Sequence, residues 1–334
     1  MKTVVLTNDL SSSDMIGSDL YQKYVKLLEE DIRAYFSDPA ALVNTFCPVD
    51  KNVRGENVFE KFKFSYQKCN TCKSYYVNPR PKPELLEQFY VDSKACRFWR
   101  EETLKLPDTQ LHYLCGLRVN WITELVDEYL SGPVALLDYE AKYANLITHL
   151  HTERIFNKIA VFKPKLYEHI DLLPDDVVVS ENGGDFVGQV DVVTAFETLE
   201  RMFDPGMLFA DAAKFCRRGG LLLFTTASCT GLEYQVLGKD APNLNPINRM
   251  NLLSIEALAE LVAKAGFEIL EFSTPGRLDV DIVNQVIKQN KDLKIDPFWR
   301  YVFEARTEKT WQGLQKFLQE NRLSSHVRIA ARKL

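Results

Sequence analysis

The chain has 334 residues, of which 46% are hydrophobic, so it is long enough for one full-sized domain and a smaller one. Its 41 basic and 46 acidic side chains give a net charge of −5, a balance that argues against a nucleic-acid-binding face. No stretch approaches the ~20 apolar residues that span a bilayer, and Asn8 and Asp9 interrupt the apolar start too early for a signal peptide. Seven cysteines, two of them in a Cys-x-x-Cys pattern, favour metal binding in a reducing compartment, so we expect a cytoplasmic protein.

The first predicted element is a helix over residues 18–36, where apolar side chains recur at helical spacing. A Ser-Asp pair at 18–19 suits the start of this helix. An Asp-Pro pair at 38–39 ends it, because proline and the residue before it disfavour helical continuation. We interpret the helix as a packing element or a dimer surface within an N-terminal segment, residues 1–43.

A zinc-ribbon-like module is predicted over residues 44–82, where two short knuckles flank a strand–turn–strand layout. Cys69 and Cys72 form the second knuckle, and Cys47 begins the first, with Asp50 where a fourth cysteine would stand. A carboxylate can also bind zinc, so these four residues are the predicted ligands of a structural zinc ion. The alternative is a metal-free module whose cysteines are buried as small apolar groups.

Helices are predicted next, at 83–90 and 111–130, within a helical linker region, residues 83–132. A Gly-Pro pair at 132–133 then leads into a series of short apolar segments at the spacing of alternating strands and helices. These predicted strands are 134–137, 158–162, 177–180, 190–195, 221–226, 267–272 and 326–331. Near-continuous apolar strands are typical of a parallel sheet buried on both faces, so the fold class is α/β.

Further helices are predicted at 255–265, around 279–290 and through 296–320. The segments that most resemble a known family are 78–81, 190–200, 204–205, 218–226, 251–254, 265–267 and 274–281. They resemble class I S-adenosylmethionine-dependent methyltransferases, in a branch with an N-terminal zinc ribbon followed by Asn-Pro-Arg-Pro. The resemblance implies a Rossmann-like seven-stranded sheet over 133–334. It also implies a place in the modification of nucleotide-linked sugars or surface polysaccharides, with a small-molecule or nucleotide-sugar ligand.

The resemblance also locates a cofactor site, at which this chain departs from the family. The acid that opens the first loop is Asp138, and the alternating glycines that should follow are Glu140, Lys142 and Ala144. Side chains there would fill space that the methionine part of S-adenosylmethionine needs, and left-handed backbone would be costly. The acid that accepts the ribose hydroxyls is replaced by Lys163, whose ammonium has donors only.

The candidate catalytic positions depart in the same way. Glu200 is followed by Arg201 where the branch has a histidine, and Arg249 replaces a second histidine. Guanidinium groups stay protonated, so neither arginine can serve as a general base.

Three hypotheses follow. The first is an active methyltransferase with unusual contacts, in which the donor binds over Asp138, Tyr139, Phe196 and Glu197 while Glu200 or Tyr234 orients the acceptor. The second is a non-catalytic relative that serves as the partner of an enzyme or as a homo-oligomer. The third is a pocket repurposed for an anionic ligand, lined by Lys142, Lys163, Arg201 and Arg249, although each cation alone could be an ordinary surface residue. We favour loss of ordinary cofactor binding.

Overall fold

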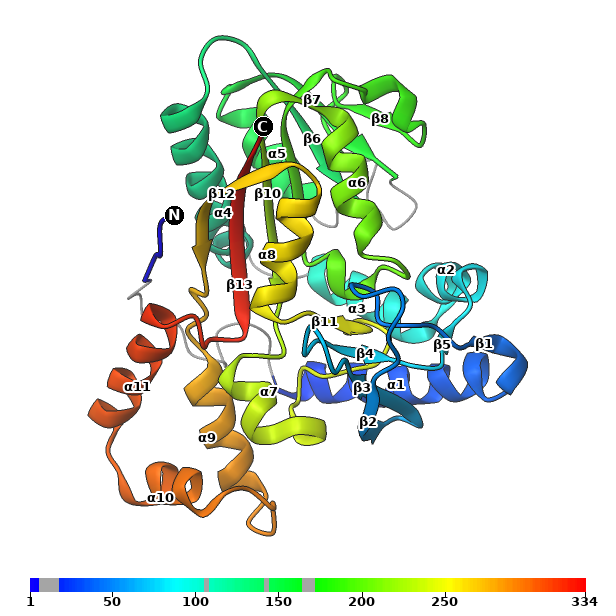
Figure 1. The fold of residues 1–334 in the computed structure, drawn as a ribbon, viewed down its shortest axis with the longest axis vertical. Helices are drawn as coiled ribbons and strands as arrows, with labels where there is room; N and C mark the ends of the chain where they lie inside the picture. Colours follow the sequence, from blue (N-terminus) through cyan, green and yellow to red (C-terminus); the bar gives the residue numbers. More distant parts are fainter. Residues whose placement is uncertain (6–17, 105–107, 141–143, 164–171) are drawn as a thin grey trace.

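The computed structural model describes residues 1–5, 18–104, 108–140, 144–163 and 172–334 of the chain (Figure 1). Its centre is a seven-stranded sheet in the order β12-β13-β10-β9-β6-β7-β8. The strands are β6 (Val134–Tyr139), β7 (Phe156–Phe162), β8 (Val178–Ser180), β9 (Val190–Phe196), β10 (Cys216–Ala227), β12 (Phe267–Ser273) and β13 (His326–Lys333). Only β13 runs antiparallel to its neighbours in this sheet. The predicted α/β class and Rossmann-like sheet are confirmed.

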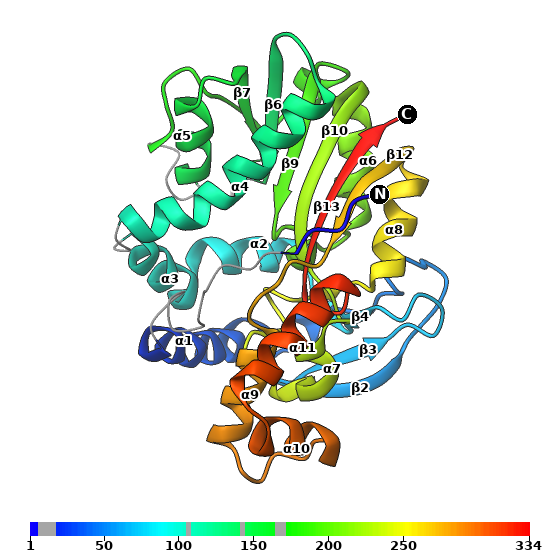
Figure 2. The same cartoon turned by 90° about the vertical axis from the view of Figure 1, so that its left-hand side faces the viewer.

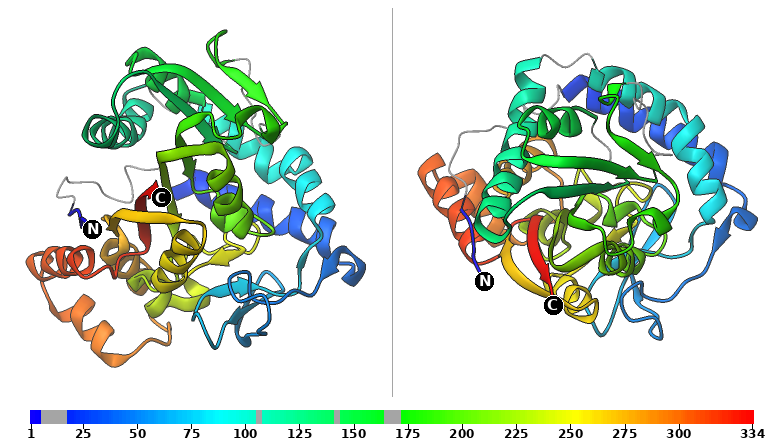
Figure 3. Two further views of the ribbon diagram at one scale, coloured as in Figure 1. Left: turned by 45° about the horizontal axis from the view of Figure 1, so that its top comes forward. Right: turned by 90° about the horizontal axis from the view of Figure 1, so that it is seen from above.

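Helices cover both faces of the sheet (Figure 3). The four that do so are α4 (Asp108–Tyr129), α5 (Ala144–Thr152), α6 (Gly206–Phe215) and α8 (Ile255–Lys264). Because successive side chains of a strand point to opposite faces, Leu136 packs in the cluster of α4 and α5. Its neighbour Leu137 packs in the cluster of α6 and α8. The apolar strands predicted from the sequence are therefore buried on both sides.

An N-terminal lobe lies across the carboxyl ends of the parallel strands (Figures 1 and 2). Its helices are α1 (Ser18–Phe36), α2 (Pro83–Asp92) and α3 (Lys94–Leu104), and its strands include β1 (Leu42–Val43), β2 (Glu56–Lys61), β3 (Phe64–Lys68), β4 (Tyr75–Val77) and β5 (Arg80–Pro81). The predicted helix at 18–36 is confirmed with the same bounds. This placement puts the lobe where a ligand of the parallel sheet would bind.

The small sheet of this lobe contains a strand from a distant part of the chain. Its order is β11-β4-β3-β2, and β11 is Asn251–Leu252. Asn251 pairs with Tyr76 and Leu252 with Tyr75. The boundaries 1–43, 44–82, 83–132 and 133–334 remain predictions, but the zinc-ribbon-like segment does not complete its sheet alone.

The C-terminal part of the chain adds helices at the far end of the molecule (Figure 2). They are α7 (Leu232–Leu237), α9 (Asp279–Gln289), α10 (Pro297–Ala305) and α11 (Glu308–Glu320). Elsewhere in the chain, 3₁₀ helices occur at Pro39–Ala41, Gly183–Phe186, Leu199–Arg201 and Gly238–Asp240.

The buried Asp279 carboxylate accepts from Ser325 N at 2.7 Å and from the Ser324 hydroxyl, which joins α9 to the start of β13. No described helix is both long and apolar enough to cross a membrane.

Arg80, in the Asn-Pro-Arg-Pro motif, joins the lobe to the central domain. The side chain is 1% exposed, and burial lowers its pKa to about 10. Its Nη1 donates to the Phe203 carbonyl oxygen at 2.7 Å and its Nε to that of Val77 at 3.2 Å. Nearby, the Asn78 amide oxygen accepts from Thr45 N at 2.8 Å. The motif therefore fixes the lobe against the loop that follows β9.

We expect Arg80→Ala to lower the free energy of unfolding by about 2–4 kcal/mol, because two buried carbonyl acceptors lose a charged donor and the long side chain leaves a cavity. Urea unfolding followed by circular dichroism measures this. The exposed Arg306 provides the control, and Arg306→Ala should change stability by less than about 0.5 kcal/mol. Equal stability of the Arg80→Ala and unmodified proteins would contradict the assigned role.

Candidate functional site

Three neighbouring strands end in the same unusual backbone conformation. Glu140, Lys163 and Glu197 follow β6, β7 and β9 with φ of 48°, 53° and 52°. Their amides donate to the next strand, to the carbonyl oxygens of Phe162, Ser180 and Thr225. The left-handed region favours glycine and costs other residues about 1–2 kcal/mol. The chain thus retains a glycine-like backbone at this edge without the glycines, which marks it as a candidate site.

The last two residues of β6 carry polar side chains that point to opposite faces of the sheet. The Asp138 carboxylate is buried and accepts from the Thr194 hydroxyl at 2.7 Å. The Tyr139 hydroxyl donates to Asp211 Oδ2 at 2.8 Å, and burial, reinforced by that carboxylate, raises the Tyr139 pKa well above its ordinary value. Tyr139 is therefore a packed core residue beneath the cleft.

Opposite charges gather above Tyr139. Lys163 Nζ lies 3.9 Å from Asp211 Oδ2 and 5.0 Å from the centre of the Phe162 ring. Burial raises the pKa of the Glu140 carboxyl, and the nearby Arg201 and Lys163 partly oppose this shift. The structure therefore places Glu140 near Lys163, two positions of the predicted cofactor site, and adds Asp211, for which the sequence offered no signal.

Two other positions of the predicted cofactor loop are placed less directly. Lys142 lies outside the described residues, so its position in the cleft stays a prediction. Ala144 begins α5 and is buried in the cluster of α4 and α5. Ala144, where the resemblance expects the last glycine, is therefore a buried residue of α5.

Glu197, which follows β9, belongs to a separate group of polar side chains. Glu197 Oε1 accepts from the Thr225 hydroxyl at 2.9 Å, and Arg118 Nη2 lies 3.5 Å from it. His326 Nδ1 lies 3.9 Å from the same oxygen. The Arg118 guanidinium also lies 5.1 Å from the centre of the buried Phe196 ring. Phe196 and Glu197 thus lie at the carboxyl end of β9, and their role in a cofactor site stays a prediction. Arg118 was not foreseen, because it comes from α4, far away in the sequence.

The candidate catalytic residues form a buried ion pair. Glu200 is 0% exposed, and its Oε1 pairs with Arg249 and accepts from Ala227 N at 3.3 Å. Its other oxygen has no hydrogen-bond partner among the described residues, and the same holds for Arg201 Nε. The Arg201 guanidinium lies 5.6 Å from the centre of the Tyr90 ring on α2. Arg201 therefore lies between the strand ends and the N-terminal lobe. Its buried Nε and the second Glu200 oxygen have no hydrogen-bond partner among the described residues.

The predicted pocket for an anionic ligand therefore carries less positive charge than four unpaired cations would give it. Glu200 neutralises Arg249, and Asp211 lies close to Lys163. Lys163 still exposes 38% of its side chain. Lys163 and Arg201 are the predicted cations best placed for an incoming anion.

A buried acid that the sequence did not single out lies near Arg249. Glu233 is 3% exposed, and burial, followed by the nearby Asp279, raises its pKa to about 7. Asn243 Nδ2 donates to its carboxylate at 3.3 Å. Tyr234, the sequence candidate next to it, is also buried, and burial raises its pKa. No local pattern distinguishes Glu233, because its surroundings come from distant segments.

Three predicted metal ligands form a cluster in the N-terminal lobe. Ligand atoms of Cys47, Cys69 and Cys72 all lie within 4.8 Å of one another, and Sγ of Cys47 and Cys72 are 3.5 Å apart. The hydrogen bond between these two thiols lowers the pKa of Cys72 to about 5. Asp50 does not join the cluster, because its carboxylate accepts from Asn52 N at 3.3 Å while its amide donates to Cys47 Sγ. Three soft sulfur donors fit a zinc ion, and the carboxylate is turned away.

Several solved structures with a similar fold are described as methyltransferases. Geranyl diphosphate methyltransferase has 17% identity and a TM-score of 0.44, over 70% of this chain and 95% of that one. Haemonchus contortus phosphoethanolamine N-methyltransferase 2 has 15% identity and a TM-score of 0.44, over 78% and 62%. An S-adenosylmethionine-dependent methyltransferase from Mesorhizobium loti has 11% identity and a TM-score of 0.39, over 64% and 98%. These likenesses concern the fold alone.

In sequence, no curated protein matches the chain. A family model described as a methyltransferase domain does match, over residues 108–272. This segment contains β6 to β10 and the strand ends at which the candidate site lies. Residues 108–272, just under half of the chain, are therefore similar in sequence to a methyltransferase domain.

Proposed function

We propose that this protein keeps the methyltransferase fold but no longer binds S-adenosylmethionine in the ordinary way, and that its cleft holds an anionic small molecule. One observation carries the proposal, namely that Lys163, which is partly exposed, and Arg201, whose buried Nε has no hydrogen-bond partner among the described residues, both lie near Glu140. The role that follows is non-catalytic or ligand-binding. An expected setting is nucleotide-sugar or surface-polysaccharide modification, with a partner enzyme or a second copy of the chain.

The residues at the cleft do not fit S-adenosylmethionine, which supplies a methyl group from a sulfonium centre. Its ribose hydroxyls need an acceptor at the end of the second strand, where Lys163 offers only donors. Glu140 adds a side chain at a left-handed position that glycine would leave open. The first change removes an acceptor for the ribose hydroxyls, and the second fills space next to the strand end.

The same residues favour a phosphorylated ligand. The ammonium of Lys163 is partly exposed, and Arg201 has an unpartnered buried Nε within the described part of the chain. Lysine and arginine are the usual partners of phosphate oxygens. Hydroxyl groups of a sugar could donate to the free Glu200 oxygen, which lacks a described partner. A nucleotide or nucleotide-sugar combines these groups.

The second candidate is an active methyltransferase with atypical cofactor contacts. Two observations favour it. Asp138 is still present at the carboxyl end of β6, and Glu140, Lys163 and Glu197 keep the left-handed backbone after β6, β7 and β9. Glu200 or Tyr234 would then orient the acceptor. Cofactor affinity separates the two candidates.

We expect S-adenosylmethionine to bind roughly 10–100-fold more weakly than low-micromolar affinity, because a charge-assisted contact to the ribose is lost. Calorimetric titration measures this. Lys163→Asp restores an acceptor and should strengthen binding, whereas Lys158→Asp, at the exposed other end of β7, should not. Low-micromolar binding by the unmodified protein would reverse the order of the two candidates.

We expect a nucleoside diphosphate or nucleotide-sugar at 100-fold excess over its Kd to raise the Tm by about 4 °C. Lys163→Ala should abolish most of this shift, because the partly exposed cation at the cleft is removed. The matched control is Lys158→Ala, which should keep the shift. A rise in Tm that Lys163→Ala leaves intact would place the ligand elsewhere.

We further propose that Cys47, Cys69 and Cys72 hold one structural zinc ion, and that the free thiols suit a cytoplasmic location. Metal analysis of the purified protein should find about one equivalent of zinc per chain. Cys69→Ser should lose the metal and destabilise the lobe, whereas Cys96→Ser, outside the cluster, should retain it. Absence of zinc from a folded, unmodified protein would refute this assignment.

A further inference from the structure

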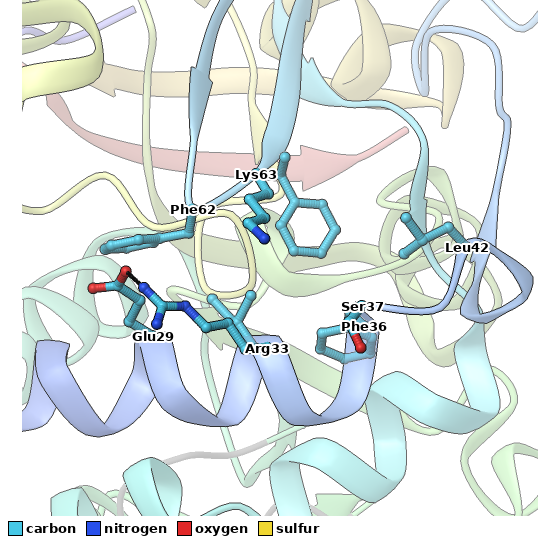
Figure 4. A pocket seen from close by; sticks show the side chains of 9 residues that line it. Glu29, Arg33, Phe36, Ser37, Leu42, Phe62 and Lys63 are labelled. Carbon is cyan, nitrogen blue, oxygen red and sulfur yellow. Dashed lines mark hydrogen bonds and ion pairs between the residues drawn. The ribbon is translucent and has the colours of Figure 1, made fainter.

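A cavity of about 170 Å³ lies between the C-terminal half of α1 and the turn that joins β2 to β3 (Figure 4). None of the strand-end residues Glu140, Lys163 and Glu197 lines it. Apolar side chains form most of its wall, namely Ile32, Phe36, Leu42, Phe62 and Phe64. An engineered apolar cavity of similar size, roughly 150 Å³, binds benzene, so this one has room for a single six-membered ring.

The floor of the cavity is a fixed pair of aromatic rings. Phe36 and Phe64 are 6% and 3% exposed, and their ring centres are 6.0 Å apart at an angle of 71°. Phe36 also packs on Phe89 of α2, with ring centres 5.4 Å apart. This packing limits rotation of both floor rings. A flat ligand would therefore meet a preformed surface.

The turn above the cavity is built from residues that turns of this kind disfavour. Phe62 and Lys63 have φ of 49° and 65°, and they connect the paired residues Lys61 and Phe64. A two-residue hairpin turn with positive φ at both positions is usually Asn-Gly. Here the turn instead supplies an aromatic ring and an ammonium group to the cavity wall.

One cation at the cavity has no counter-charge. Arg33 pairs with Glu29 one turn away on α1, so those two side chains neutralise each other. Lys63 has no hydrogen-bond or ion-pair partner among the described residues, and Figure 4 shows its ammonium beside the cavity. An apolar pocket with one free positive charge complements a flat apolar ring that carries one negative charge.

We propose that this cavity binds a monocyclic aromatic carboxylate, with its ring on Phe36 and Phe64 and its carboxylate on Lys63. The apolar wall disfavours phosphate groups, whose oxygens would be left unpaired there. The free ammonium disfavours amines. The site is separate from the strand-end cleft, and its occupation does not depend on the function proposed for that cleft.

Calorimetric titration of the full chain with benzoate tests the proposal. We expect a Kd of about 1 mM or tighter, which a ring and a carboxylate together can supply. The neutral benzamide and the ring-less acetate should each bind at least tenfold more weakly. Lys63→Gln should weaken benzoate binding roughly tenfold through loss of the charged contact. Lys26→Gln, an exposed change on α1 outside the cavity, should leave it unchanged.

A second variant tests the cavity itself. Leu42→Trp should fill the space and abolish benzoate binding, with folding checked by circular dichroism. Lys63 is exposed, so Lys63→Gln remains informative even where the larger substitution disturbs folding. Equal affinity for benzoate and benzamide, unchanged benzoate affinity in Lys63→Gln, or no benzoate binding by the unmodified protein would each overturn the proposal.

Discussion

The contact between the N-terminal lobe and the carboxyl ends of the parallel strands determines the environment of the candidate site. Arg80 donates from the lobe to the loop after β9, and β11 crosses from the central domain to pair with β4. Without these links Tyr90 would not lie over Arg201. Glu200 is fully buried at this edge, and burial strengthens its charge interaction with Arg249 and raises the cost of its unpaired oxygen.

This environment explains why the charges of Glu140, Lys163 and Asp211 balance one another. Glu140 and Lys163 occupy strand ends whose backbone is suited to glycine, and Asp211 from α6 lies close to Lys163. A lone cation at a partly buried edge would be unfavourable, whereas a balanced group is tolerated. The Glu200 carboxylate and the Arg249 guanidinium balance each other in the same way. The carboxyl ends of β6, β7 and β9 therefore carry acidic side chains close to basic ones.

The central sheet could be predicted from sequence because buried parallel strands leave long apolar runs, as in 190–195 and 221–226. The positions of Glu140 and Lys163 could be predicted because each directly follows such a run. Glu233 and Arg118 could not, because their partners come from segments far apart in the chain. Asp50 has the spacing of a ligand, but spacing alone does not reveal that its carboxylate is used by a local turn.

The pairing of β11 with β4 has a consequence for the order of events during synthesis. About 175 residues separate Tyr76 from Asn251, its partner in the sheet. At a translation rate of about 5–20 residues per second, the edge of β4 waits roughly 10–35 s for its partner strand. An unpaired strand edge in a nascent chain is open to wrong pairing. The small sheet of the lobe is therefore begun about 175 residues of synthesis before its last strand is available.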